Sequence, residues 1–130
     1  MDSTFQLGSS IPVLRMLDET KTKSFYLHYL GYTINWEHRF RESESSPLYA
    51  QVSQGESVLH LNGHADENSP TCEVRVPVQH LDLYCEYLCA KEMGFGEPSV
   101  DDPRYEGRNT DMNLVDPSGS QLVFWSPQEA

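Results

Sequence analysis

The stretch IPVLRMLDETKTKSFYLHYLG (11–31) sets the pattern from which the fold follows. Within it, IPVLRML (11–17) alternates around Arg15 in the way that is typical of a strand. Asp18 is a suitable helix N-cap, and apolar side chains then recur at helical spacing as far as Gly31, which favours a helix end there. The stretch therefore predicts a strand followed directly by a helix.

Three further strands are predicted in the first half of the chain. YTINWEHRF (32–40) alternates again and is followed by the polar loop RESESSP (41–47). LYAQVS (48–53) and SVLHLN (57–62) flank the turn QGE, as the two strands of a hairpin would. Residues 11–62 therefore predict one module with the element order βαβββ.

The second half repeats this order with different side chains. CEVRVPV (72–78) predicts a strand, and the apolar positions that follow mark a helix face at 81–88. A loop-rich stretch at 98–109 precedes strands predicted at 110–115 and 121–125. A duplication of this length indicates a fold built from two equivalent units.

The two halves align when Arg15 is placed over Arg75. We therefore predict a single α+β domain spanning residues 1–130, with one βαβββ module at 11–62 and a second βαβββ module at 71–126. The two modules are expected to form a cupped mixed sheet with the helices on its outer face.

Alternation along the strands predicts which side chains face the helices. The helix-facing set is apolar throughout: Leu14, Met16, Leu59, Leu61, Val74, Val76, Val78, Leu122 and Phe124. The opposite set is mixed: Ile11, Val13, Arg15, Val58, His60, Asn62, Glu73, Arg75, Val123 and Trp125. A cupped face with this mixture suits a small-molecule site in which a few polar groups orient the ligand.

The charge balance limits the classes of partner. Nine Lys and Arg residues stand against twenty Asp and Glu residues, which gives a formal net charge of -11. Such a field repels nucleic acid and anionic membranes and attracts cationic ligands. No apolar run reaches the roughly 18 residues of a membrane helix, and the opening MDSTFQLGSS lacks a signal-peptide pattern, so we expect a cytoplasmic protein.

The cysteine content agrees with that expectation. There are three cysteines, and Cys85 and Cys89 lie one turn apart on the predicted helix, which is a poor geometry for a disulfide. The thiols are therefore expected to be core or half-buried groups.

Two histidines four residues apart, His60 and His64, raise the question of a metal site. His64 would lie at or beyond the end of its strand, about 13 Å from His60 if the strand continued, so the spacing alone does not make them a ligand pair. His28, His38 and His80 are expected to be surface residues.

Three long segments carry a family likeness: IPVLRMLDETKTKSFYLHYLGYTINWEHRF (11–40), LYAQVSQGESVLHL (48–61) and DMNLVDPSGSQLVFW (111–125). The chain resembles the glyoxalase, bleomycin resistance and dioxygenase superfamily, whose fold is called the vicinal oxygen chelate fold. The most specific pieces are FY-x-x-x-LG (25–31) and the closing DP-x-G turn (116–119). Within the superfamily the chain looks most like the glyoxalase-related proteins grouped with bleomycin resistance proteins.

Enzymes of this superfamily bind a divalent metal through side chains on four strands, and the resemblance places these positions at Ile11, His60, Glu73 and Val123. His60 and Glu73 alone would form a weak site, because catalytic sites commonly have three protein ligands. The missing ligands argue against a glyoxalase-type lyase, and no cofactor is favoured. The alternative is a metal-dependent glyoxalase or dioxygenase-type enzyme that uses His60 and Glu73, with His64 folding back as a third ligand.

Bleomycin resistance proteins imply a different use of the same cup. The resemblance implies a homodimer whose clefts sequester a cationic glycopeptide drug without changing it chemically, and thereby confer antibiotic resistance. The candidate ligand-binding residues are Arg15, Trp36, Tyr49, His60, Glu73, Arg75, Tyr105 and Trp125, with further negative charge from Asp101, Asp102, Glu106 and Asp111. A bleomycin-resistance-type binding protein is the function that we expect.

One segment departs from the family pattern. Bleomycin-binding relatives often carry Pro-Trp-Gly before the seventh strand, whereas this chain has PRYEGRNTDM (103–112) there. Tyr105 is the nearest aromatic residue and Arg108 adds a positive charge. This departure leaves room for a different ligand, including an anionic one held by Arg15, Arg75 or Arg108.

Overall fold

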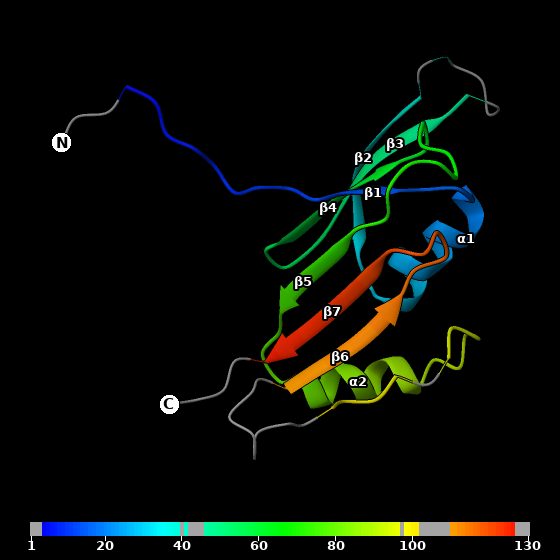
Figure 1. The fold of residues 1–130 in the computed structure, drawn as a ribbon. Helices are drawn as coiled ribbons and strands as arrows, with labels where there is room; N and C mark the ends of the chain where they lie inside the picture. Colours follow the sequence, from blue (N-terminus) through cyan, green and yellow to red (C-terminus); the bar gives the residue numbers. More distant parts are fainter. Residues whose placement is uncertain (1–3, 40, 42–45, 97, 102–109, 127–130) are drawn as a thin grey trace.

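Two mixed β-sheets and two helical segments make up the part of the chain that the computed structural model describes, which is residues 4–39, 41, 46–96, 98–101 and 110–126 (Figure 1). The first half contains β1 (Val13–Arg15), α1 (Glu19–Lys23), η1 (Ser24–Tyr29), β2 (Thr33–Arg39), β3 (Leu48–Gln54) and β4 (Ser57–Asn62). The second half contains β5 (Glu73–Pro77), α2 (Leu81–Cys89), β6 (Thr110–Val115) and β7 (Gln121–Ser126).

The predicted duplication is visible in the strand pairing. The first sheet has the order β1-β4-β3-β2, with β1 parallel to β4 and the other neighbours antiparallel. The second sheet has the order β5-β7-β6, with β5 parallel to β7 and β6 antiparallel to β7. In both sheets the first strand of the half therefore pairs in parallel with its last strand, and the predicted α+β class is confirmed.

The second half shows one strand fewer than the first within the described residues. The strand without a counterpart is β2, which follows the helical segment of the first half. The equivalent place in the second half is the stretch 98–109, which is predicted to be loop-rich, and residues 102–109 of it lie outside the described residues. Within the described part of this stretch, Asp101 forms an isolated antiparallel bridge with Asp111 on β6. This bridge puts the start of the segment beside the free edge of β6.

The first helical segment begins where the sequence predicts. Asp18 Oδ1 accepts a hydrogen bond from the backbone N–H of Lys21 at 2.9 Å, as an N-cap should. The predicted single helix is instead α1 followed by the π-helix η1, in which the N–H of Leu30 bonds to the carbonyl of Phe25. Gly31, with φ of 89°, ends the segment in a backbone conformation that favours glycine.

The predicted helix-facing side chains form the core. Leu14, Met16, Leu59, Leu61, Val74, Val76, Leu122 and Phe124 are all buried, and Val78 packs against them at the margin. On the opposite face Ile11 and Val13 are exposed, whereas Val123 is only 1% exposed. Val123 is shielded because β7 is the central strand of its sheet, with Arg75 and Asn113 on either side of it.

A buried carboxylate joins the two halves. Asp116, in the turn between β6 and β7, accepts hydrogen bonds from the hydroxyl of Tyr26 at 2.7 Å and from the backbone N–H groups of Ser118 and Ser120 at 2.9 Å each. Burial and the negative charge of Asp116 both raise the pKa of Tyr26. The hydroxyl of Tyr26 therefore stays protonated and remains a donor to the second half.

None of the described helices is long and apolar enough to cross a membrane.

Replacing Asp116 should destabilise the whole fold. Asp116→Ala leaves three buried donors without an acceptor, so we expect the free energy of unfolding to fall by about 3 kcal/mol or more, against about 1 to 2 kcal/mol for Tyr26→Phe. Urea denaturation followed by circular dichroism measures both. The control is Glu86→Ala on the exposed face of α2, which should change stability by less than about 0.5 kcal/mol. An Asp116→Ala variant as stable as the control would contradict this role.

Candidate ligand-binding site

Three of the predicted ligand-binding residues meet on the solvent-facing side of the first sheet. Trp36 stacks on Tyr49 with ring centroids 6.0 Å apart and an interplanar angle of 12°. The imidazole of His60 stands edge-on to both rings, 5.4 Å from Trp36 and 5.2 Å from Tyr49. The three side chains therefore form one cluster across β2, β3 and β4, which we call the aromatic cluster.

A β-bulge places Trp36 in this cluster. Ile34 is opposite Val52, which belongs to the core, whereas Trp36 is opposite Gln51, whose side chain is on the outer face. Strict alternation would put Ile34 and Trp36 on the same face, but the register shifts between them, with Asn35 as the extra residue. The strand can therefore pack Ile34 against the core, where it is partly buried, and still present Trp36 to solvent, where it is 42% exposed.

A chain of hydrogen bonds fixes the ring of His60. Its Nε2 lies 2.9 Å from Gln51 Oε1 and its Nδ1 lies 2.8 Å from the hydroxyl of Tyr49. Because the Gln51 oxygen can only accept, Nε2 carries a hydrogen, whereas the hydroxyl of Tyr49 can either donate to Nδ1 or accept from it. Gln51 in turn donates from its Nε2 to Asn35 Oδ1 at 3.2 Å. The imidazole is therefore held by a hydrogen bond on each side.

Gln51 and Asn35 were not among the residues that we predicted for the site. The signal for Gln51 was present in the sequence, because it alternates with the buried Ala50 and Val52 and so shares the outer face with Tyr49. The role of Asn35 depends on the bulge, which alternation does not reveal.

The residues at the metal positions of the superfamily do not fit a metal ion. Both ring nitrogens of His60 are already engaged, Nδ1 by Tyr49 and Nε2 by Gln51. Ile11 and Val123 have no ligating atom, and Glu73 is exposed on β5. Within the described part of the chain, no three His, Cys, Asp or Glu side chains gather in a way that could hold a metal.

Of the other histidines, His38 lies beside the aromatic cluster, because it is directly opposite Tyr49 in the pairing of β2 with β3. The ring of His64 is exposed in the turn after β4, where its backbone N–H bonds to Asn62 Oδ1. His28, His38 and His80 are exposed, as the sequence predicted.

Arg15 has partners that give it a structural role. Its Nε donates to the carbonyl of Ser118 at 2.8 Å, and its Nη1 donates to the carbonyls of Glu67 at 3.0 Å and Ser69 at 2.8 Å. The guanidinium thus ties β1 to the segment between the halves and to the turn between β6 and β7. We predicted a ligand contact for Arg15, but the structure places it at the junction of the two halves.

The other predicted residues that the structure describes lie on the second sheet. The guanidinium carbon of Arg75 lies 5.9 Å from the centre of the Trp125 ring, and Arg75 Nη2 lies 3.8 Å from Asp111 Oδ1. That oxygen is buried and has no hydrogen-bond partner among the described residues. Glu73 is two residues before Arg75 on β5, and Tyr105 lies outside the described residues. The predicted set is therefore divided between the two sheets.

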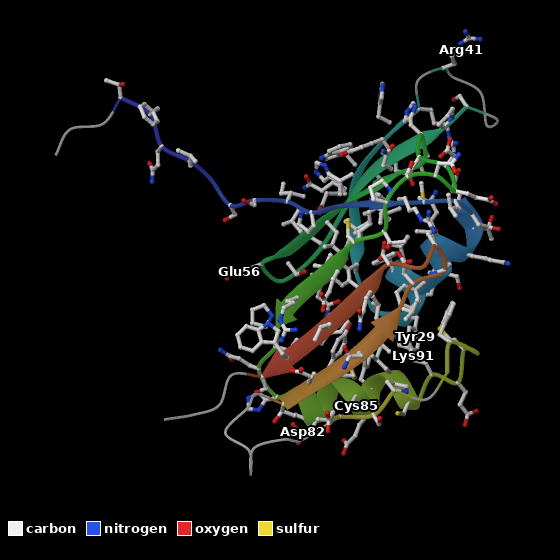
Figure 2. All side chains as sticks on the ribbon, viewed as in Figure 1. Tyr29, Arg41, Glu56, Asp82, Cys85 and Lys91 are labelled. Atoms are coloured by element: carbon white, nitrogen blue, oxygen red, sulfur yellow. The ribbon has the colours of Figure 1, made fainter. Side chains whose placement is uncertain are left out.

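An open groove of about 970 Å³ lies between the two halves. One wall is the β3–β4 hairpin end at 54–59, where Figure 2 labels Glu56, and the other is the segment 74–80. Tyr32, Tyr84 and Phe124 also line it. Among the predicted ligand-binding residues that the structure describes, only Arg75 reaches this groove, so the groove and the aromatic cluster are different surfaces.

Comparison of the fold with solved structures gives matches over nearly the whole chain. TnmS3, an antibiotic binding protein from Streptomyces sp. CB03234, is 17% identical, with a TM-score of 0.65 over 95% of this chain and 100% of that one. A bleomycin-binding protein complexed with bleomycin is 22% identical, with a TM-score of 0.62 over 94% and 100% of the two chains. A glyoxalase-related enzyme from Clostridium phytofermentans is 15% identical, with a TM-score of 0.71 over 98% and 100%.

These identities are low, so the structural matches establish a shared fold and nothing more. A search of curated protein sequences gave no match. The sequence profile described as glyoxalase superfamily protein, in contrast, matches residues 3–130, which is almost the entire chain. This protein therefore belongs to the glyoxalase superfamily.

Proposed function

We propose that this protein is a bleomycin-resistance-type binding protein, which sequesters a planar, cationic small molecule at the aromatic cluster without changing it chemically. The observation that carries the proposal is the exposed indole of Trp36, backed by Tyr49 and flanked by an imidazole whose orientation is fixed. An exposed aromatic face of this kind is a stacking surface for a planar ring.

The surroundings of the cluster favour an aromatic ligand that also carries positive charge. The formal net charge of -11 draws cations toward the surface. Hydrogen-bonding groups beside the rings, on Gln51 and Asn35, can orient a polar edge of the ligand. Stacking then supplies affinity, and the polar groups supply orientation.

Two of the structural neighbours support this ligand class. One is an antibiotic binding protein and the other is a bleomycin-binding protein. We therefore propose an antibiotic as the natural ligand and resistance by sequestration as the biological role.

A metal-dependent lyase or dioxygenase using His60 and Glu73 is the less favoured alternative. Such an enzyme would need one ring nitrogen of His60 to give up its present hydrogen bond, with Tyr49 at Nδ1 or with Gln51 at Nε2. We therefore propose binding that does not use a metal or another cofactor.

We further propose that the protein works as a homodimer. The N-terminal segment before β1 extends away from the two sheets (Figure 1), and its Phe5 and Leu7 are 75% and 83% exposed. Within the described residues β1 and β5 each have a strand neighbour on one side only, β4 and β7 respectively. A second copy that covers the segment 4–12 and these edges would bury apolar surface that the single chain leaves in water.

The ligand proposal predicts the effect of removing the indole. Titration calorimetry and tryptophan fluorescence with metal-free bleomycin, copper-loaded bleomycin and a planar cationic anthracycline should find a ligand that binds at tens of micromolar or below. Trp36→Ala should weaken the binding of that ligand by about tenfold or more, because the stacking surface is lost.

The matched control is Tyr87→Ala on α2, because Tyr87 is a similarly exposed aromatic residue, at 46% against 42% for Trp36. This variant should bind like the wild type. Absence of binding by all three compounds, or unchanged binding by Trp36→Ala, would contradict the proposal.

The dimer proposal predicts that the N-terminal segment stabilises association. Sedimentation at tens of micromolar should show a dimer for the wild type and a shift toward monomer for the double variant Phe5→Ser, Leu7→Ser. Val115→Ser removes another exposed apolar side chain, 65% exposed on β6, and should leave the dimer unchanged. A monomeric wild type would rule out the proposed assembly.

A further inference from the structure

Two thiols of α2 converge on one carbonyl oxygen. Cys85 and Cys89 are four residues apart, so their side chains project from the same face of the helix. The Sγ atoms of both residues donate to the carbonyl of Pro98, each at 3.4 Å. Their shared acceptor turns the two sulfur atoms toward each other.

The hydroxyl of Tyr29 is the second unusual feature at this place. Tyr29 is 1% exposed, and its Oη has no hydrogen-bond partner within the described part of the chain. Burial, and then the neighbouring Cys89 and Cys85, raise the pKa of this hydroxyl. The hydroxyl of Tyr29 is therefore a buried donor without an acceptor, on the side of the core where the charge of either thiol affects its pKa.

Packing holds these groups in place. Lys91, just after α2, donates from Nζ to the carbonyl of Tyr29 at 2.8 Å, and Tyr84 donates to the carbonyl of Leu30 at 2.8 Å. Figure 2 labels Tyr29, Cys85 and Lys91 where α2 approaches η1. Solvent reaches the pair from one side, because Cys89 is exposed and Cys85 is half-buried. The expectation of a core or half-buried thiol is thus wrong for Cys89, which is exposed to solvent.

The spacing fits a bridging ion better than a disulfide. Side chains at i and i+4 of a helix have Cβ atoms about 5 to 6 Å apart, whereas a disulfide needs about 3.5 to 4.5 Å. An ion between two sulfur atoms, with metal–sulfur bonds of about 2.3 Å as for zinc, lets the sulfurs lie up to about 4.6 Å apart. The helix can therefore accommodate the ion without moving its backbone.

The choice of ion follows from the ligand set. A structural zinc site has four ligands, commonly thiolate or imidazole. Here the oxygen beside the two thiols is the carbonyl of Pro98, which is a poor ligand for a soft ion, and no third Cys, His, Asp or Glu joins them among the described residues. Two thiolates suit a soft monovalent ion that accepts low coordination, as copper(I) does.

We propose that Cys85 and Cys89 form a binding site for a soft thiophilic metal ion of the copper(I) class. On binding, each thiol releases its proton to water and two metal–sulfur bonds form, with no change in oxidation state. The hydroxyl of Tyr29 then donates a hydrogen bond to a thiolate sulfur, which supplies the acceptor that it lacks in the metal-free protein. This site is separate from the aromatic cluster and does not depend on the proposed function.

Competitive titration tests the site. The reduced protein is titrated anaerobically with copper(I) against the chromogenic chelator bicinchoninate. We expect one tightly held ion per chain, and Cys85→Ser and Cys89→Ser should each lower the affinity by about a hundredfold or more. Tyr29→Phe should lower it by about tenfold, because the hydrogen bond to the thiolate is lost.

The third cysteine provides the control. Cys72 is half-buried at the start of the second half, and its Sγ donates to the carbonyl of Val13, so Cys72→Ser should keep the wild-type affinity. If Cys85→Ser and Cys89→Ser both bind copper(I) with the wild-type affinity, the proposed site is overturned. If Tyr29→Phe binds with the wild-type affinity, the proposed hydrogen bond from the Tyr29 hydroxyl to a thiolate is wrong.

A measurement on the unaltered chain covers the case in which a variant does not fold. One equivalent of copper(I) should protect Cys85 and Cys89 of the wild-type protein from alkylation by iodoacetamide, and should leave the labelling of Cys72 unchanged, as read by peptide mass spectrometry. If the labelling of Cys85 and Cys89 is the same with and without copper(I), the proposal fails.

Discussion

The carboxylate of Asp116 is the point on which the arrangement of the two halves depends. It is buried, it accepts from Tyr26 in the first half, and it shapes its own turn through the N–H groups of Ser118 and Ser120. This turn places Ser118 against β1 and the residues just after it. Arg15 donates to the carbonyl of Ser118, and the N–H of Leu17 donates to its hydroxyl. One buried acceptor thus positions the second sheet against the first, since each of these donors would otherwise lose hydrogen bonding to water.

The aromatic cluster depends on the first sheet alone, and on a local irregularity within it. The bulge at Asn35 lets Ile34 pack against the core while Trp36 is exposed, and the cross-strand partners Gln51 and His60 then hold the rings at fixed angles. Orientation before binding matters because a preorganised surface loses little side-chain freedom when a ligand arrives. The rigid sheet therefore prepares the face on which we propose that the ligand stacks.

The sequence was sufficient for the features that depend on periodicity. Alternation identified the buried sets of β1, β4, β5 and β7, and Asp18 and Gly31 marked the ends of the first helical segment. It was not sufficient where one residue breaks the period or where distant segments meet. The bulge before Trp36 and the place of Arg15 among three carbonyls depend on strand register and on contacts between the halves, which no local pattern encodes.

The central claim is that the outer face of β2, β3 and β4 is the surface that binds the ligand. Mapping of backbone amide chemical shifts in the ¹⁵N-labelled protein, during titration with a compound that binds, tests this most directly. We predict that the largest shifts fall on Trp36, Tyr49, Gln51 and His60. Shifts confined to the groove residues, such as Val76 and Leu83, with none on β2 and β3, would contradict the account.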